Sequence, residues 1–204
     1  VTSGDIDTLP YDVDELVDVS TTEFRLADPL DDGVYRWRVI AQDEALNTNF
    51  SEEGPSFRVD TQVAAPALVF PAAEATVGDP QPSFQWTHIG DVHQPVVFDL
   101  QVTSGDLDTG PYDLDETALG GTSFKPAAPL LTGDQVSGNR QGFQWRMRAR
   151  DAAGNFSIYV TGDFAIDLNA PVIGLVEPTD GRIITSDDFT TFQWKVTDIA
   201  QAFD

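Results

Sequence analysis

Ten carboxylates that could coordinate a metal ion come in two matching sets of five. The first set is Asp5, Asp7, Asp12, Asp14 and Glu15, and the second is Asp106, Asp108, Asp113, Asp115 and Glu116. Calcium takes about six to eight oxygen ligands from carboxylates and carbonyls, so each loop predicts a calcium site. Asp106-x-Asp108-x-Gly110 begins like an EF-hand, but Thr117 stands at the twelfth position and Leu9 replaces the glycine in the other copy. The alternative is a solvated turn in which Asp side chains cap backbone groups.

A second candidate site is a strip of arginines. Five of the eleven basic residues alternate along two equivalent segments, at Arg36, Arg38, Arg146, Arg148 and Arg150. Alternate residues of a strand share a face, so these side chains predict a positive strip with which outward carboxylates such as Asp99 could pair. Two interpretations stay open: ordinary cross-strand pairing that contributes little, or a contact face for the self-association of an acidic protein.

The residue types offer little for catalysis. There is no cysteine, which excludes thiol nucleophiles and thiolate metal sites. His88 and His93 occur in one copy only and lack a repeated carboxylate partner. No phosphate-binding glycine loop or serine nucleophile motif is present. We therefore expect a protein that is not an enzyme, with no cofactor other than calcium.

The acidic loops belong to an internal repeat of the whole chain. VTSGDIDTLPYDVDE opens the sequence and returns 101 residues later as VTSGDLDTGPYDLDE, with twelve of fifteen residues identical. The motif FQW at residues 84–86 recurs at 192–194, and a closing F-x-V/I-D occurs at 57–60 and 164–167. Such a repeat predicts copies of one domain of about a hundred residues.

The register of the repeat predicts one complete domain between two partial ones. Residues 1–60 are the C-terminal two-thirds of one copy, 61–167 a complete copy, and 168–204 the N-terminal third of another. Residues 202–204 match 97–99, so both ends of the chain fall inside the same predicted strand. Either the copies continue in one longer polypeptide, which we favour, or separate subunits polymerise head to tail by strand complementation. A band at the 22.2 kDa of this chain, on denaturing electrophoresis of native material, would contradict the longer polypeptide.

Short alternating runs between Pro, Gly, Asp and Asn predict an all-β sandwich. In the complete copy we expect strands at residues 67–70, 83–87, 96–103, 122–125, 143–150 and 163–167. The strand at 96–103 should turn Phe98, Leu100 and Val102 inward and Asp99, Gln101 and Thr103 outward. The strand at 143–150 should place Phe143, Trp145, Met147 and Ala149 in the core.

The sequence FQWRMRARDAAGNFS at residues 143–157, together with FQW and F-x-V/I-D before Pro66 and Pro171, resembles a known domain family. It is similar to the immunoglobulin-like and fibronectin type III-like repeats found in tandem on bacterial and archaeal surface proteins. The resemblance implies tandem Ig-like sandwiches, with residues 149–157 on a late strand and its hairpin. In the copy at residues 1–60, Leu46 stands at the position that Gly154 has in the complete copy, so we expect the two copies to form different turns at this point.

The junctions between copies are a further candidate for calcium. Residues 167–171, Asp-Leu-Asn-Ala-Pro, are similar to the calcium-stiffened junctions of cadherin-like domains, and residues 60–63 less so. Neither junction has enough acidic residues for a full set of calcium ligands. We prefer short connectors stiffened by proline.

Composition narrows the classes of partner. The net charge of −23 excludes nucleic acid as a partner, because binding a polyanion needs a basic face. No apolar run is long enough to cross a bilayer, so membrane insertion is not expected of this segment.

We therefore expect a structural repeat segment of an extracellular filament, sheath or giant adhesin stalk at the cell surface. Its partners would be further copies of the repeat, in the same chain or in head-to-tail subunits, and a cell-surface or glycan ligand. The alternative is a carbohydrate-binding accessory array of a secreted enzyme, which should expose aromatic side chains in line on one face. The tryptophans stand mostly at predicted core positions, which favours the structural role.

Overall fold

The computed structural model describes residues 1–18, 20–91, 94–131, 140–185 and 191–197, which form strands and no helix. The chain divides into two compact units, Val1–Gln62 and Val63–Asp204. The boundary falls close to the one predicted between the first two copies, and the third predicted domain is grouped with the second. No described segment forms a helix long and apolar enough to cross a membrane.

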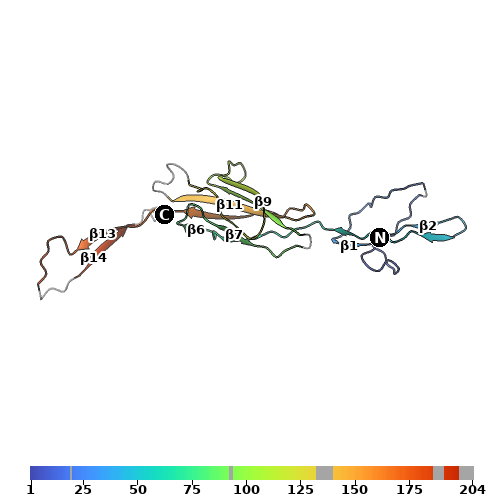
Figure 1. Ribbon diagram of the computed structural model, residues 1–204, viewed down its shortest axis with the longest axis horizontal. Helices are drawn as coiled ribbons and strands as arrows, with labels where there is room; N and C mark the ends of the chain where they lie inside the picture. The colour runs from blue at the N-terminus through green and yellow to red at the C-terminus, as the bar shows by residue number, and fades with distance from the viewer. Residues whose placement is uncertain (19, 92–93, 132–139, 186–190, 198–204) are drawn as a thin grey trace. The chain divides into compact units, whose positions relative to one another are not determined.

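Unit 2 contains a β-sandwich, as the alternating runs predict (Figure 1). One sheet has the order β10-β7-β5 and the other the order β6-β12-β11-β8-β9, and among the described strands only β6 and β12 pair in parallel. The strands are β5 (Ala67–Phe70), β6 (Ala75–Val77), β7 (Phe84–Thr87), β8 (Val97–Thr103), β9 (Leu114–Leu119), β10 (Ser123–Phe124), β11 (Gln141–Arg150) and β12 (Val160–Ile166). We call residues 63–167, which hold both sheets, the complete module.

The core of the complete module lies between the two sheets. Phe84 and Trp86 of β7 meet the inward side chains of the larger sheet, and the Phe84 and Trp145 ring centroids are 5.1 Å apart. All the inward positions predicted on β8 and β11 are buried, which confirms the alternation there. Asp99 and Thr103 were predicted to face outward, yet both are buried as well. Arg148 covers Asp99, and the Thr103 hydroxyl donates to the carbonyl of Pro111 over 2.9 Å.

Two strands of the complete module were missed. β6 is only three residues long and is held by parallel pairing to β12, a long-range contact with no local signal. β9 lies in what we predicted to be the acidic loop, and it places Asp115 opposite Gln101 and Glu116 opposite Leu100. As an edge strand, it tolerates outward carboxylates that a central strand would not.

The turn after β11 is held by an Asp–Asn pair. Asp151 accepts hydrogen bonds from the backbone nitrogen and the side-chain amide of Asn155, both over 2.8 Å. In the first copy, Asp43 accepts the same two bonds from Asn47, over 2.8 and 2.9 Å. Our expectation of a different turn there was wrong, because Leu46 adopts a φ of 69° where Gly154 has a φ of 96°.

Leu46→Gly is expected to stabilise unit 1 by up to about 1 kcal/mol. A left-handed conformation costs a side-chain-bearing residue about 1–2 kcal/mol, and part of this gain is lost to the greater freedom of glycine in the unfolded chain. Urea unfolding of the full chain followed by circular dichroism measures the change. Gly154→Ala is the matched control and should destabilise unit 2; a loss of stability in Leu46→Gly would contradict the interpretation.

Acid is expected to weaken the Asp151 turn. Burial alone would raise the pKa of Asp151, but the hydrogen bonds from Asn155, Gly154 and Ala153 outweigh it and lower that pKa from 3.8. A lowered carboxyl pKa gives stability that is present above 3.8 and is lost as the pH falls through the folded-state value. Asp151→Asn should therefore lose less stability than the wild type between pH 5 and pH 2, as measured by urea midpoints. Equal losses in the two proteins would contradict this role.

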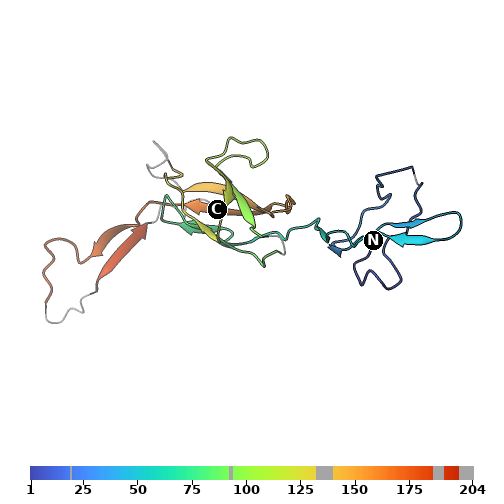
Figure 2. The same ribbon diagram turned by 45° about the vertical axis from the view of Figure 1, so that its right-hand side comes forward.

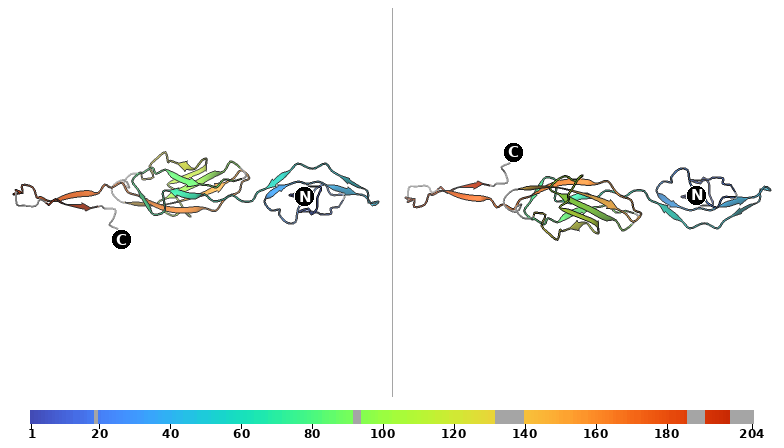
Figure 3. Two further views of the ribbon diagram at one scale, coloured as in Figure 1. Left: turned by 90° about the horizontal axis from the view of Figure 1, so that it is seen from below. Right: turned by 90° about the horizontal axis from the view of Figure 1, so that it is seen from above.

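Unit 1 repeats the later strands of the complete module, and its described residues form small two-stranded sheets. Figure 3 shows this unit in blue to teal. Its strands are β1 (Gly33–Tyr35), β2 (Ile40–Gln42), β3 (Thr48–Phe50) and β4 (Phe57–Val59). β1 pairs with β4 and β2 with β3, all antiparallel. Tyr35 stacks on Phe57 at 5.7 Å between centroids, as Phe143 stacks on Phe164 at 5.4 Å.

After the complete module, β13 (Val172–Glu177) and β14 (Gln193–Thr197) form an antiparallel pair, in orange and red in Figure 2. We call it the terminal hairpin. Its sequence repeats that of β5 and β7, and its two strands pair in the same way. The end of the predicted third copy, residues 202–204, lies outside the described residues.

Candidate functional site

The acidic loop of the complete module is folded around its own carboxylates. Asp106 accepts from the backbone nitrogen of Asp108 over 2.7 Å, and Asp113 accepts from the backbone nitrogen of Ser104. Asp108 pairs with Arg146 at 3.3 Å. The loop therefore has the Asx-type capping that was the alternative to a metal site.

The first copy places its carboxylates in the same way. Asp5 accepts from the backbone nitrogen of Asp7 over 2.9 Å, Asp12 accepts from the backbone nitrogen of Ser3, and Asp7 pairs with Arg38 at 2.7 Å. Asp14 and Glu15 are exposed. In the second copy, Asp115 accepts from the Gln101 amide over 3.1 Å and Glu116 is half-buried on β9.

The predicted calcium ligands are not gathered around one point. Within the part of the chain that the structure describes, no three of these ten carboxylates offer oxygens within 4.8 Å of one another. Calcium binding stays a prediction, and thermal melts with calcium and with a chelator test it.

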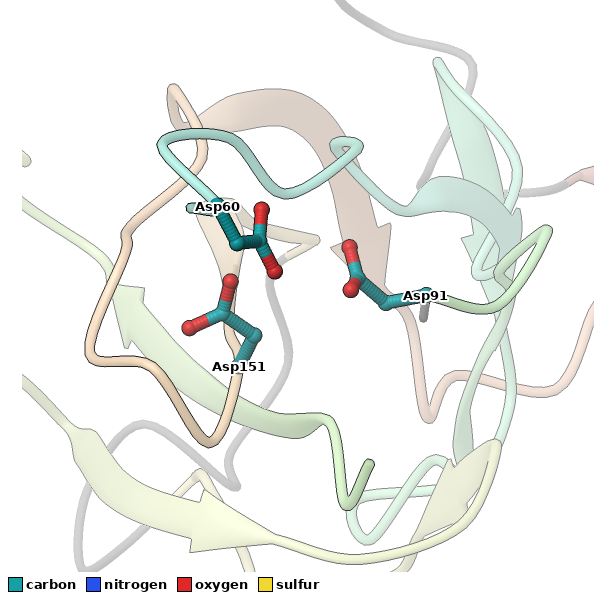
Figure 4. Close-up of side chains that lie close together, drawn as sticks. All are labelled: Asp60, Asp91 and Asp151. Atoms are coloured by element: carbon teal, nitrogen blue, oxygen red, sulfur yellow. The ribbon is translucent and has the colours of Figure 1, made fainter. Parts of the chain in front are cut away.

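Figure 4 shows Asp91 and Asp151, two carboxylates of unit 2 with oxygens within 4.8 Å of each other. Asp60, the third side chain labelled there, belongs to unit 1. Two carboxylates supply too few oxygens for calcium, and Asp151 already holds its turn. The pair therefore does not make a metal centre by itself.

His88 is engaged within the module. One ring nitrogen lies 2.8 Å from the carbonyl oxygen of Ala64, the other accepts from the backbone nitrogen of Gly90 over 3.0 Å, and the ring packs on Phe98. These contacts give it a structural role. His93 lies outside the described residues.

The arginine strip lies along β11 and is built into its own sheet. Arg146 donates to Gln101 over 2.8 Å and to the Tyr112 hydroxyl over 2.9 Å, besides its ion pair with Asp108. Arg148 donates to the buried Asp99 over 2.9 Å, which confirms the predicted cross-strand pairing. Because Arg148 is only partly exposed, this pair is screened less than an ordinary surface pair.

Two aromatic side chains that the sequence analysis missed stack on the same arginines. The Arg146 guanidinium carbon lies 4.4 Å from the ring centroid of Tyr159, and that of Arg148 lies 4.1 Å from the centroid of Phe156. Arg150 also approaches Phe156, at 5.7 Å. Such cation–π contacts stabilise by about 0.5–1 kcal/mol each at exposed sites. The strip is thus an arginine–aromatic ladder on the outer face of the sheet.

The first copy keeps part of this ladder. Arg38 donates hydrogen bonds to Tyr11 and Asp7, as Arg146 does to Tyr112 and Asp108. The bonds to Tyr11 and Asp7 raise the pKa of Arg38, and the bond to Tyr11 has the larger effect. Arg36 lies opposite Thr2, as Gln144 lies opposite Thr103, so it repeats a glutamine rather than a ladder arginine. Arg36 instead pairs with Glu53 at 3.2 Å, where both side chains are about half exposed. Self-association through the five arginines stays a prediction.

The site residues thus form two matched loop-and-ladder assemblies, each within its own copy of the repeat. Their contacts connect the acidic loop to the strand of arginines, so they fix the loop on the sheet. These residues do not bring a nucleophile and a base together at a pocket. The arrangement suits a rigid module.

Comparisons with known proteins identify no family for this chain. No protein-family model and no curated protein match the chain. Among solved structures, it is similar to the crystal structure of chicken CNTN1 FN1-FN3 domains, with a TM-score of 0.32 and 13% sequence identity. The match covers 71% of this chain and 48% of that one, so the chain spans about half the length of that structure. The strand order of the complete module is that of an all-β, Ig-like sandwich.

Proposed function

We propose that this chain is a structural segment of an extracellular filament, sheath or adhesin stalk, built as a tandem array of β-sandwiches. One observation carries the proposal: the repeat extends from sequence to strand pairing. β13 and β14 pair in the register of β5 and β7, and the loop-and-ladder contacts occur twice. A protein that repeats one module at this level of detail is suited to a role set by the number of modules.

The proposed role is non-enzymatic. The polar side chains of the candidate sites are engaged in holding loops and turns, and the fold is of a kind that serves as structural or adhesive modules. A carbohydrate-binding array would need aromatic side chains exposed in line, but both tryptophans of the complete module are buried. A cell-surface or glycan ligand is proposed only for another part of such an array.

Immunogold labelling tests the location. Antibodies raised against the full chain should label the outer surface of intact cells of the source organism, on extended structures seen by electron microscopy. Protease added to intact cells should remove the label. Labelling that appears only after the cells are permeabilised would contradict the proposal.

A further inference from the structure

The larger sheet of the complete module has a groove of about 740 Å³ on its outer face. Gly142 of β11 and Ala165 of β12 lie opposite each other in the sheet, and both line the groove. A Cβ added at Gly142 would meet nothing within 4 Å, so the space above this position is open. Glycine inside a strand often marks a place where a ligand or another chain comes close to the backbone. The volume is within the range of ligand sites, about 300–1,000 Å³.

The other copy of the repeat fills this space with side chains of its own. In unit 1, Val34 lies opposite Arg58 at the positions that Gly142 and Ala165 have in the complete module. Each of these larger side chains occupies part of the space that is open here. All residues that line the groove lie between positions 74 and 165, inside the complete module. The groove is therefore a property of this copy and does not follow from the repeat.

Four polar side chains line the groove, those of Glu74, Arg140, Gln144 and Asp163. Among the residues that the structure describes, none of these four side chains makes a hydrogen bond or an ion pair. Glu74 and Asp163 are neighbours, because the backbone nitrogen of Glu74 donates to the carbonyl oxygen of Asp163 over 3.0 Å. Gln144 lies opposite Asp163 in the sheet. The groove thus has two adjacent carboxylates on one side and two hydrogen-bond donors on the side of β11.

This lining suits a side chain that is apolar along its stem and positively charged at its end. The methylene groups of an arginine can pack on Gly142 and Ala165 while the guanidinium stays at the polar rim. A guanidinium presents five N–H donors in a fixed fork that matches carboxylates, so Glu74 and Asp163 are suitable partners. Unit 1 has such a side chain in its own sequence, since Arg58 stands at the position of Ala165.

We propose that the groove binds an arginine side chain of a partner polypeptide. Glu74 and Asp163 accept hydrogen bonds from the guanidinium, and Arg140 and Gln144 donate to carbonyl oxygens of the partner's backbone. The net charge of −23 attracts a basic partner from a distance. The inference goes beyond the proposed function, because it concerns one copy of the repeat and does not depend on where the protein is located.

A nuclear magnetic resonance titration of the full chain tests the proposal. The probe is the tripeptide Ala-Arg-Ala with an acetylated N-terminus and an amidated C-terminus. The backbone amide signals of Gly142, Asp163 and Ala165 are expected to shift and to saturate as the peptide is added. The same peptide with citrulline, which has the length of arginine but no charge, should bind at least about fivefold more weakly. Added salt should weaken the binding of the arginine peptide, because it screens exposed charges.

Substitutions in the groove separate its charge from its shape. Asp163→Asn and Glu74→Gln should each weaken binding by about twofold to fivefold, as expected for the loss of a partly exposed ion pair. Gly142→Val introduces the side chain that unit 1 has at this position and should abolish the saturable shifts. Asp115→Asn is the matched control, since it removes one exposed carboxylate from β9, at the opposite edge of the same sheet. It should leave the affinity unchanged.

Three results would overturn the inference: no saturable shifts at the groove, a citrulline peptide that binds as tightly as the arginine peptide, or a Gly142→Val variant that is folded by circular dichroism and still binds. Equal losses of affinity in Asp163→Asn and Asp115→Asn would also overturn it, because binding would then follow net charge alone. The proposed function fails separately, through the absence of surface labelling. Labelled cells with a chain that does not bind the peptide would overturn the inference alone.

Discussion

Trp145→Ala is expected to lower the free energy of unfolding of the complete module by about 3–5 kcal/mol, which is the usual cost of truncating a fully buried tryptophan. Trp145 is fully buried at the centre of β11 and packs on Phe84. Alanine would leave a cavity between the two sheets that the surrounding strands can fill only in part. Urea unfolding of the full chain, followed by fluorescence of the remaining tryptophans and by circular dichroism, measures the loss.

The repeat supplies its own control for this prediction. Trp37→Ala removes the same residue type at the equivalent position of unit 1, where the side chain is partly exposed. Its cost should be well under half that of Trp145→Ala. Equal costs would show that burial in the sandwich is not what makes Trp145 important.

Gly162→Ala is expected to destabilise the complete module by about 1–3 kcal/mol, the usual cost of overpacking. A Cβ added at Gly162 would lie 2.8 Å from Nε1 of Trp145 and 3.2 Å from Cδ1 of Leu68. Trp145 is enclosed by the core and has no room to move away. The added methyl group would therefore separate the strands or tilt the indole ring. The urea midpoint of the full chain measures the effect.

Gly142→Ala is the matched control for Gly162→Ala. Gly142 lies on β11, which pairs with the strand of Gly162, and a Cβ there would meet nothing within 4 Å. It should leave the stability unchanged or raise it slightly, since glycine is unfavourable inside a strand by about 0.5–1 kcal/mol relative to alanine. Equal destabilisation by both substitutions would contradict the steric explanation.

The long strands could be predicted from the sequence because their side chains alternate. Phe98, Leu100 and Val102 on β8 are buried as predicted, and the inward residues of β11 likewise. β6 and β9 could not be predicted in this way. β6 depends on a partner more than eighty residues away in the chain, and the outward carboxylates of β9 imitate those of a loop. Leu46 shows a further limit, because hydrogen bonds from Asn47 hold a turn that the residue type disfavours.

The candidate site was predicted in part. The arginine strip and its pairing with Asp99 follow from period-two spacing and strand adjacency. The stacking of Phe156 and Tyr159 on that strip does not, because it depends on how the chain returns after the Asp151 turn. The acidic residues suggested calcium by number alone. Their geometry depends on which backbone nitrogen each carboxylate meets, and sequence spacing does not contain that information.

The ladder arginines form ion pairs inside their own modules, and this affects how extended arrays of this chain would pack side by side. Arg38, Arg146 and Arg148 are each neutralised by a carboxylate of their own module, in a chain with 34 acidic and 11 basic residues. Little positive charge is left to attract a parallel neighbour. Arrays lying side by side are therefore expected to behave as mutually repelling polyanions, kept apart over roughly 8 Å at physiological ionic strength. Bundling would require multivalent counterions, and in dilute salt the arrays should remain separate from one another.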